Sequence, residues 1–89
     1  MSASVKVLIA SPLRPYTDAD EVEAVGATLG DLLHDLDARY PGIRFRMIDE
    51  QDQVRRHMRI FINGEPVKNL AHPIRSSDEV SIVQALSGG

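Results

Sequence analysis

Apolar and polar residues alternate in two segments that lie near opposite ends of the chain. Residues 5–9 (VKVLI) and residues 78–86 (DEVSIVQAL) both carry β-branched side chains at every second position. A period of two is typical of strands, so both segments are predicted to be strands, with Val80 and Ile82 of the second facing the core. Leu8 lies on the second face of the first segment and indicates a central strand that is partly covered on both sides.

The segment after the first strand predicts a hairpin. Residues 21–25 (EVEAV) alternate acidic and apolar side chains, so they are expected to pair back onto residues 5–9 with the valines toward the core. The connecting residues 11–17 (SPLRPYT) contain two prolines and cannot continue a ladder of strand hydrogen bonds. We therefore expect a turn there.

Residues 28–40 carry the clearest helical pattern of the chain. Thr28 is predicted to cap the N-terminus, and Asp31 is expected in the electropositive first turn. The apolar side chains fall at helical spacing and form one stripe, which we interpret as core: Leu29, Leu32, Leu33, Leu36 and Tyr40. The Pro41-Gly42 pair is expected to end the helix.

A second hairpin is predicted around Asn63-Gly64. The segment before it, residues 58–62, places Met58, Ile60 and Ile62 on one face. Asn and Gly both tolerate a positive φ, which a two-residue hairpin turn requires. A brief return strand through residue 67 is expected to be limited by its proline, Pro66.

The segment between the helix and this hairpin is less clearly patterned. Ile43, Phe45 and Met47 alternate, so a short strand over residues 43–47 is one interpretation. The following residues 49–53 (DEQDQ) are predicted to be a polar loop.

The elements occur in the order β-β-α-β-β-β. The helix is long enough to act as a crossover, so the last strand can lie parallel to the first. The predicted fold class is α+β: a ubiquitin-like β-grasp with a mixed sheet of about four to five strands and one main helix packed across it. We expect residues 1–86 to form this domain and residues 87–89 to be a flexible Ser-Gly-Gly tail.

Composition agrees with one globular domain and narrows the list of partners. The chain has 89 residues, of which 43% are hydrophobic and 26% are charged. Its net charge of −3 argues against binding to nucleic acids or to anionic membranes. The apolar runs are too short to span a bilayer, and the first residues lack the charged region of a signal peptide. The expectation is a cytoplasmic protein that is monomeric when free.

The sequence contains few side-chain patterns that indicate catalysis or the binding of a metal or a cofactor. The chain has no cysteine, and its three histidines, His34, His57 and His72, lie far apart in sequence. This spacing does not favour a metal site over ordinary surface histidines, so no metal is expected. Neither a GxSxG nucleophile elbow nor a glycine-rich phosphate loop occurs. The sequence therefore predicts no stably bound cofactor and no enzyme of the usual kinds.

Four segments together resemble one known family. They are TLGDLL at the start of the helix, RIFINGE at the second hairpin, DEVSIVQA in the final strand, and the terminal SGG. Along nearly the whole chain the sequence is similar to the MoaD/ThiS sulfur carriers, which are ubiquitin-like proteins. Two positions depart from the family, which often has Gly-Asp where this chain has Ser77-Asp78 and often has proline near Gln84. The length and the LRPYT segment look closest to the carriers for cysteine or thio-metabolite synthesis.

The resemblance implies a mechanism at the C-terminus. A ubiquitin-activating-enzyme-like adenylyltransferase is expected to use ATP to adenylate the carboxylate of Gly89. A sulfur donor then displaces AMP, and the resulting thiocarboxylate delivers covalent sulfur to an acceptor synthase, for example one that depends on pyridoxal phosphate. The chain would be a co-substrate and not an enzyme. The acceptor pathway is cysteine or another sulfur metabolite, with molybdopterin and thiamin as further options.

The same resemblance maps Ser87, Gly88 and Gly89 onto the family's functional tail, so Ser87 and Gly88 are expected to bind partners. Leu86 is expected to add an exposed apolar contact for the partner enzymes. Phe61 either contributes an exposed apolar contact for partners or is buried against the other face of the sheet. A group of five arginines either docks an acidic partner or, as is more common, forms a solvated surface: Arg44, Arg46, Arg55, Arg56 and Arg59.

Two other functions remain open at this point. One is a protein modifier that is conjugated to lysines through Gly89. The other is a non-catalytic β-grasp binding module, for which the tail would be dispensable.

Overall fold

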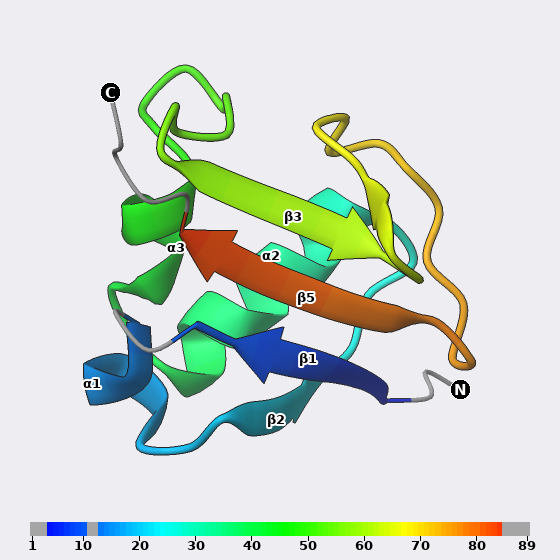
Figure 1. Cartoon of the computed structure of the whole chain (residues 1–89), viewed down its shortest axis with the longest axis horizontal. Helices are drawn as coiled ribbons and strands as arrows, with labels where there is room; N and C mark the ends of the chain where they lie inside the picture. The colour runs from blue at the N-terminus through cyan, green and yellow to red at the C-terminus, as the bar shows by residue number, and fades with distance from the viewer. Residues whose placement is uncertain (1–3, 11–12, 85–89) are drawn as a thin grey trace.

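In the computed structural model, which describes residues 4–10 and 13–84, the chain forms a five-stranded sheet and three helices (Figure 1). The strands are β1 (Val5–Ile9), β2 (Glu21–Ala24), β3 (Met58–Ile62), β4 (Glu65–Pro66) and β5 (Glu79–Gln84). The helices are α1 (Arg14–Thr17), α2 (Leu29–Arg39) and α3 (Ile43–Met47). The strand order across the sheet is β2-β1-β5-β3-β4, so the first and last strands lie at its centre.

The strand pairing confirms the predicted mixed sheet. β1 pairs antiparallel with β2 and parallel with β5, with Val7 opposite Val80 in the parallel pair. β3 runs antiparallel to both β5 and β4. The parallel pair depends on the long connection through α2, as the crossover argument predicts.

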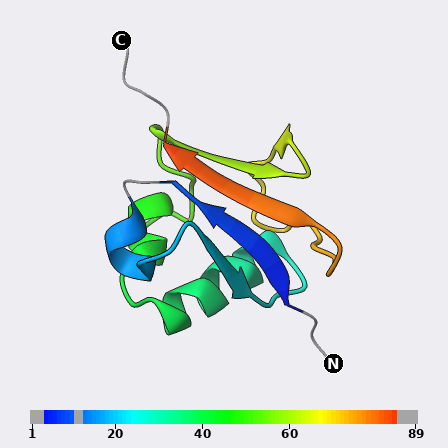
Figure 2. The same cartoon turned by 60° about the horizontal axis from the view of Figure 1, so that its bottom comes forward.

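Helix α2 has the predicted cap and four of the five residues of the predicted buried stripe, whereas Tyr40 is its C-cap and is only partly buried. The Thr28 Oγ1 accepts a hydrogen bond from the Asp31 backbone N–H at 3.2 Å. Leu29, Leu32, Leu33 and Leu36 are fully buried. Figure 2 shows the helices together on one face of the sheet. The core therefore lies between α2 and the inner face of the sheet.

The second hairpin turns where the sequence predicts. Asn63 and Gly64 have φ angles of 53° and 86°. Both angles are positive, which suits the right-handed twist of the two strands that the turn joins. The return strand β4 is only two residues long and ends at Pro66.

The prediction of a turn over residues 11–17 is wrong for its last four residues, which form α1. Pro15 lies in the first helical turn, where a missing N–H costs no internal hydrogen bond. Leu13 is 3% exposed and anchors the start of the helix in the core. Prolines exclude this segment from the sheet but not from a short helix.

The short strand considered for residues 43–47 is also wrong, because these residues form α3. The spacing of Ile43 and Met47 fits a helical turn as well as a strand, and both side chains are buried. Phe45, which a strand would place on the same face, is 56% exposed. The Asp37 Oδ1 accepts hydrogen bonds from the N–H groups of Gly42 and Arg44, and these bonds start the helix.

The two faces of the sheet differ in what covers them. Alternate residues of all the longer strands point to the inner face and are buried, as in Val5, Val7 and Ile9 of β1. In Figure 1 the sheet lies in front of α2, and no described element crosses its front. This uncovered side is called the outer face below.

Candidate functional site

The last described residue of β5 marks where the C-terminal segment begins. Gln84 lies opposite Met58 in the antiparallel pair of β5 and β3. The predicted site residues Leu86, Ser87, Gly88 and Gly89 lie outside the described residues. Their roles stay predictions, and the surroundings of Gln84 are what the structure adds.

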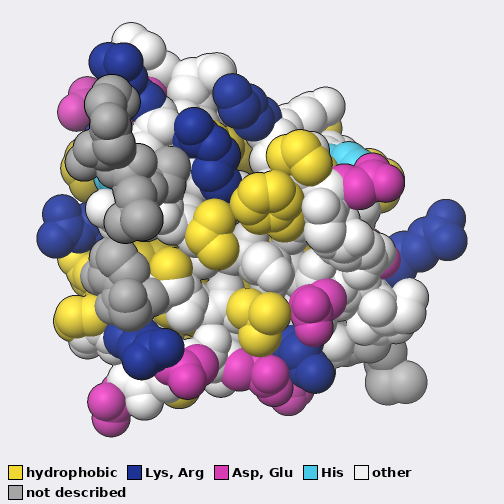
Figure 3. All heavy atoms as spheres, in the orientation of Figure 1, with side chains coloured by type: hydrophobic (Ala, Val, Ile, Leu, Met, Phe, Trp, Pro, Cys, Tyr) yellow, Lys and Arg dark blue, Asp and Glu magenta, His cyan; other side chains and the backbone are white. Residues whose placement is uncertain are grey.

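An apolar patch lies on the outer face beside the end of β5. The outer-face patch consists of Leu8, Phe61 and Val83. Both strand neighbours of Leu8 and of Phe61 are buried, and so is Ile82 before Val83. Ser81 of β5 pairs with both Leu8 and Phe61, so the residues lie in one band across three strands. Phe61 is half-buried there and Val83 is 37% exposed. Figure 3 shows hydrophobic side chains gathered on this face with basic side chains beside them.

A groove of about 510 Å³ lies at the same end of the molecule. Its lining comes from the N-cap of α1, from α3, from the segment before β3, and from the first residue of β3 and the last of β5: Leu13, Phe45, Arg46, Arg55, His57, Met58 and Gln84. We call it the basic groove, because the described residues of its lining include two arginines and a histidine and no carboxylate. Sequence reasoning grouped the arginines but missed the groove, because both segments that shape it were predicted with the wrong conformation.

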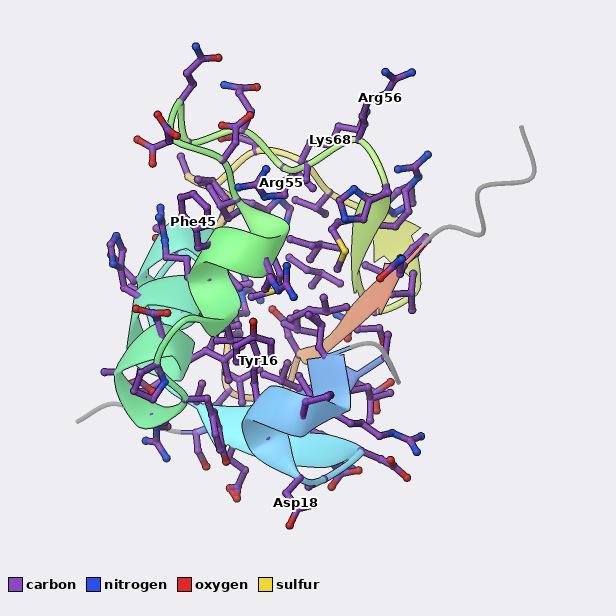
Figure 4. The ribbon with its side chains drawn as sticks, turned by 90° about the vertical axis from the view of Figure 1, so that its left-hand side faces the viewer. Tyr16, Asp18, Phe45, Arg55, Arg56 and Lys68 are labelled. Atoms are coloured by element: carbon purple, nitrogen blue, oxygen red, sulfur yellow. The ribbon has the colours of Figure 1, made fainter. Side chains whose placement is uncertain are left out.

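Aromatic rings hold the two arginines of the basic groove. The Arg55 guanidinium lies 4.8 Å from the centre of the Phe45 ring, and its Nε donates to the Phe45 carbonyl at 2.7 Å. The Arg46 guanidinium lies 5.8 Å from the centre of the Tyr16 ring, and its Nε donates to the Tyr16 hydroxyl at 2.8 Å. Figure 4 shows Phe45 and Arg55 side by side, with Tyr16 on the other side of α3. Each arginine is thereby fixed by contacts with uncharged groups.

The other arginines of the predicted cluster lie outside the basic groove and contact other groups. Arg44 forms an ion pair with Asp52, at 3.1 Å between Nη2 and Oδ1. The Arg59 Nη1 donates to the carbonyls of Arg56 and Met58. The five arginines therefore do not form one surface, and only Arg46 and Arg55 line the basic groove.

Two carboxylates have a lowered pKa, and in both cases hydrogen bonds are the main cause. The N–H groups of Gln53 and Gln51 lower the pKa of Asp49, with a smaller contribution from the charge of Arg55. The Arg75 N–H and the Asn63 side chain lower the pKa of Asp78. Both are structural effects at loops, and they do not mark an acid or base for catalysis.

No group of three or more potential metal-ligating side chains occurs among residues 4–10 and 13–84. None of the helices described is both long enough and apolar enough to cross a bilayer.

The sheet order and the helix across one face define a small ubiquitin-like β-grasp protein. Residues 7–89 match the ThiS family, and the chain belongs to that family. Proteins of this family are small carriers on which partner enzymes act, so this chain is a carrier and not itself an enzyme.

Three relatives illustrate the match. The sulfur carrier protein CysO of Mycobacterium tuberculosis is 38% identical, over 97% of this chain and 99% of the relative. The crystal structure of the Amycolatopsis orientalis BexX/CysO complex contains a chain that is 31% identical with a TM-score of 0.88, over 96% of this chain and 99% of that one. Small archaeal modifier protein 3 of Haloferax volcanii is 36% identical over 71% of each chain.

Proposed function

We propose that this chain is a sulfur carrier that holds sulfur as a thiocarboxylate on the terminal carboxylate of Gly89. The observation that supports it most is the ThiS family match, which continues past the end of β5 at Gln84 to Gly89. The relative named as a sulfur carrier matches over nearly the full length of both chains. The predicted division into a β-grasp domain and a Ser-Gly-Gly tail is part of this proposal.

The chemistry takes place in two steps on partner enzymes. A carboxylate is a poor electrophile, because a nucleophile would push negative charge onto a group that is already negative. In the first step, a Gly89 carboxylate oxygen attacks the α-phosphorus of ATP, and pyrophosphate leaves. In the second step, hydrosulfide supplied by a sulfur donor attacks the carbonyl carbon of this mixed anhydride, and AMP leaves, so that a thiocarboxylate remains on Gly89. The thiocarboxylate sulfur is then delivered to an acceptor, which we take to be on the way to cysteine or another sulfur metabolite.

The residues of the tail suit this role. Gly88 and Gly89 have no Cβ, so an extended tail can enter a narrow cleft that a side chain would block. Ser87 and Leu86 connect these glycines to the folded body and are assigned to partner binding. Ordering the tail costs about 1–2 kcal/mol per residue, which docking of the folded body can offset.

The outer-face patch is our candidate for that docking surface. Phe61 and Val83 present apolar area beside the strand that leads into the tail. A partner that covers the patch would hold Gln84 near its active site, because the patch and the tail share β5. The partners we propose are an adenylyltransferase, a sulfur donor and an acceptor synthase, of which a pyridoxal-phosphate enzyme is one example. We place their action in the cytoplasm, with the carrier monomeric when free.

Mass spectrometry of the intact protein tests this proposal. Protein from its native host should include a fraction heavier by one oxygen-to-sulfur exchange on Gly89. The cognate adenylyltransferase, ATP and a sulfur donor should generate the same species from the unmodified protein. Deletion of Gly89 should abolish it, and Gly88→Ala should reduce it, because the added methyl group obstructs the cleft. If the wild-type chain forms neither an AMP adduct nor a thiocarboxylate with its partner, the proposal is wrong.

A protein modifier is the second candidate, since the chain is also similar to a small archaeal modifier protein. In that case the adenylated Gly89 would be transferred to lysine amines of other proteins. The two candidates differ in their products. Isopeptide-linked conjugates that depend on Gly89, without any thiocarboxylate, would favour the modifier.

A further inference from the structure

The basic groove has a position and a composition that the proposed chemistry does not use. It borders Gln84, the last described residue before the tail. Its basic side chains are Arg46, Arg55 and His57. The chain as a whole has a net charge of −3, so this concentration of positive charge is local. On a protein with a negative net charge, a local positive surface attracts acidic partners to that surface and not to the rest of the molecule.

The guanidinium groups of the groove are held in place without an ion pair among the described residues, although the charge of Arg55 still acts on the Asp49 carboxylate. Among the described residues, Arg46 and Arg55 form no ion pair, whereas Arg14, Arg39 and Arg44 each pair with an aspartate. Each of the two donates only through Nε, so its two Nη groups have no hydrogen-bond partner among the described residues. The stacked rings of Tyr16 and Phe45 limit the motion of both guanidinium groups.

A fixed guanidinium with unused Nη groups matches a carboxylate. Two parallel N–H donors can bind both oxygens of one Asp or Glu side chain, and less entropy is lost because the arginine is already held. The rest of the lining supplies apolar surface from Leu13, Phe45 and Met58. An occupant with both carboxylates and an apolar side chain would satisfy both parts of the groove, and a nucleic acid or a free phosphate would satisfy only the charged part.

We propose that the basic groove binds an acidic segment of the adenylyltransferase, one that carries Asp or Glu next to an apolar side chain. This inference rests on the proposed function, because it requires a partner that engages the tail. Five residues follow Gln84. When fully extended they reach at most ~18 Å, so the groove and the partner's active site must lie close together in the complex. In the complex, the acidic segment would bind the basic groove and another surface of the partner would cover the outer-face patch. The body of the carrier would then be held from two sides.

Kinetics of AMP-adduct formation test the inference with matched variants. The double variant Arg46→Gln plus Arg55→Gln should raise the KM for the carrier by about 10–100-fold and leave the maximal rate within about twofold of wild type. Arg55→Lys keeps the positive charge but loses the two parallel N–H donors of the guanidinium group, so the KM of this variant should be intermediate. Arg75→Gln is the control, since it removes the same charge from an exposed side chain in the segment that leads into the start of β5. Added salt should raise the KM of the wild-type carrier by a larger factor than the KM of the double variant, because salt screens the charges that the double variant lacks. Thermal melting of each variant verifies the fold.

A titration of the carrier alone supplies the second arm. The probe is a short peptide with two glutamates flanking a leucine, and inorganic phosphate is titrated separately at the same ionic strength. The peptide should shift the NMR signals of the Arg46 and Arg55 Nε–H groups, and phosphate should shift them much less. Equal shifts by phosphate would overturn the inference in favour of a general anion site.

The two arms also separate this inference from the proposed function. If the wild-type chain forms the AMP adduct and the double variant does so with an unchanged KM, the inference is wrong and the carrier function stands. If the wild-type chain forms no adduct while the peptide still binds the groove, the proposed function fails instead.

Discussion

Asn63 and Asp78 are joined by a hydrogen bond of 2.9 Å from the Asn63 amide Nδ2 to the Asp78 Oδ1. The other Asp78 oxygen accepts from the Arg75 N–H at 2.8 Å. Asn63 in turn accepts from the Glu79 N–H through its Oδ1. The turn between β3 and β4 is therefore fixed to the start of β5, and with it the antiparallel pair that carries the tail.

We expect acid to weaken the hydrogen bonds that the Asp78 carboxylate accepts from Asn63 and Arg75. The pKa of Asp78 in the folded protein lies below its ordinary value of 3.8, because the Arg75 N–H and the Asn63 amide stabilise the charged form. The carboxylate therefore adds stability that is complete above its unfolded pKa and is lost as the pH falls through the lower folded pKa. Compared with wild type, Asp78→Asn should be less stable at neutral pH, and the difference should shrink below about pH 4.

Denaturant unfolding at several pH values measures this difference. Asp49 also has a lowered pKa, so the Asp78→Asn protein should still lose some stability in acid, although less than the wild-type protein loses. A constant difference between the two proteins from neutral pH down to the acid range would contradict the role of the Asp78 charge.

The fold could be predicted largely because its signals are local. The cap at Thr28, the leucines of α2 and the positive φ angles at Asn63-Gly64 each depend on a few neighbouring residues. Residues 43–47 fit a strand and a helix equally well by spacing. What decides for the helix is the Asp37 carboxylate, which binds the Gly42 and Arg44 N–H groups and whose role the pattern of apolar residues does not reveal.

A tight backbone approach at Gly26 gives a second prediction. A Cβ added there would lie 2.7 Å from the Leu32 Cα and 2.8 Å from the Asp31 carbonyl carbon. Both are backbone atoms of α2 and cannot move away without shifting the helix. Gly26→Ala should therefore destabilise the protein by about 3 kcal/mol or more, the upper part of the range for overpacking.

Gly64→Ala is the matched control for this clash. Nothing lies within 4 Å of a Cβ at this position, but the φ angle is +86°. The cost should be the strain of a left-handed backbone alone, about 1–2 kcal/mol. Chemical unfolding of both variants tests the order, and a smaller loss for Gly26→Ala than for Gly64→Ala would show that α2 yields more easily than the contacts indicate.

Truncation of the leucine stripe gives the third prediction. Leu36 is fully buried between α2 and the sheet. Leu36→Ala should lower the free energy of unfolding by about 2–5 kcal/mol, and Leu33→Ala by a similar amount. His34→Ala, on the exposed side of the same helix, should change it by less than about 0.5 kcal/mol. Losses below 2 kcal/mol at both leucines would mean that the stripe contributes little to the core.

The candidate site could be predicted only in part, for a physical reason. Gly89 and its neighbours are adjacent in sequence, so a motif can indicate them. The basic groove combines Leu13, Phe45 and Arg55 with Gln84, which come from four separate segments. Only the folded chain brings them together, and no spacing within one segment carries that information. Phe61 shows an intermediate case, because alternation placed it on one face of β3 but did not tell which face lies open.

The outer-face patch provides the fourth prediction. Phe61→Ser removes most of the apolar area of a half-buried side chain without adding a charge. If a partner covers the patch, the KM for AMP-adduct formation should rise about tenfold, which corresponds to about 1.4 kcal/mol. Lys6→Ser on the same face is the control, because Lys6 lies outside the patch and its ion pair with Glu21 is exposed. An unchanged KM in a folded Phe61→Ser protein would remove the patch from the docking surface.

The last prediction concerns the tail in the free carrier. β5 ends at Gln84, and Gly88 and Gly89 have no side chains with which to pack. We therefore expect residues 87–89 to be flexible on the picosecond-to-nanosecond timescale, with backbone order parameters below about 0.6. Ile82, in the centre of the sheet, is the internal control and should have a value near about 0.85. ¹⁵N relaxation measures both. Binding of the adenylyltransferase should raise the values of the tail residues, because an extended tail in a cleft loses this freedom. Rigid values for Gly88 and Gly89 in the free monomer would contradict a tail that becomes ordered only in its partner.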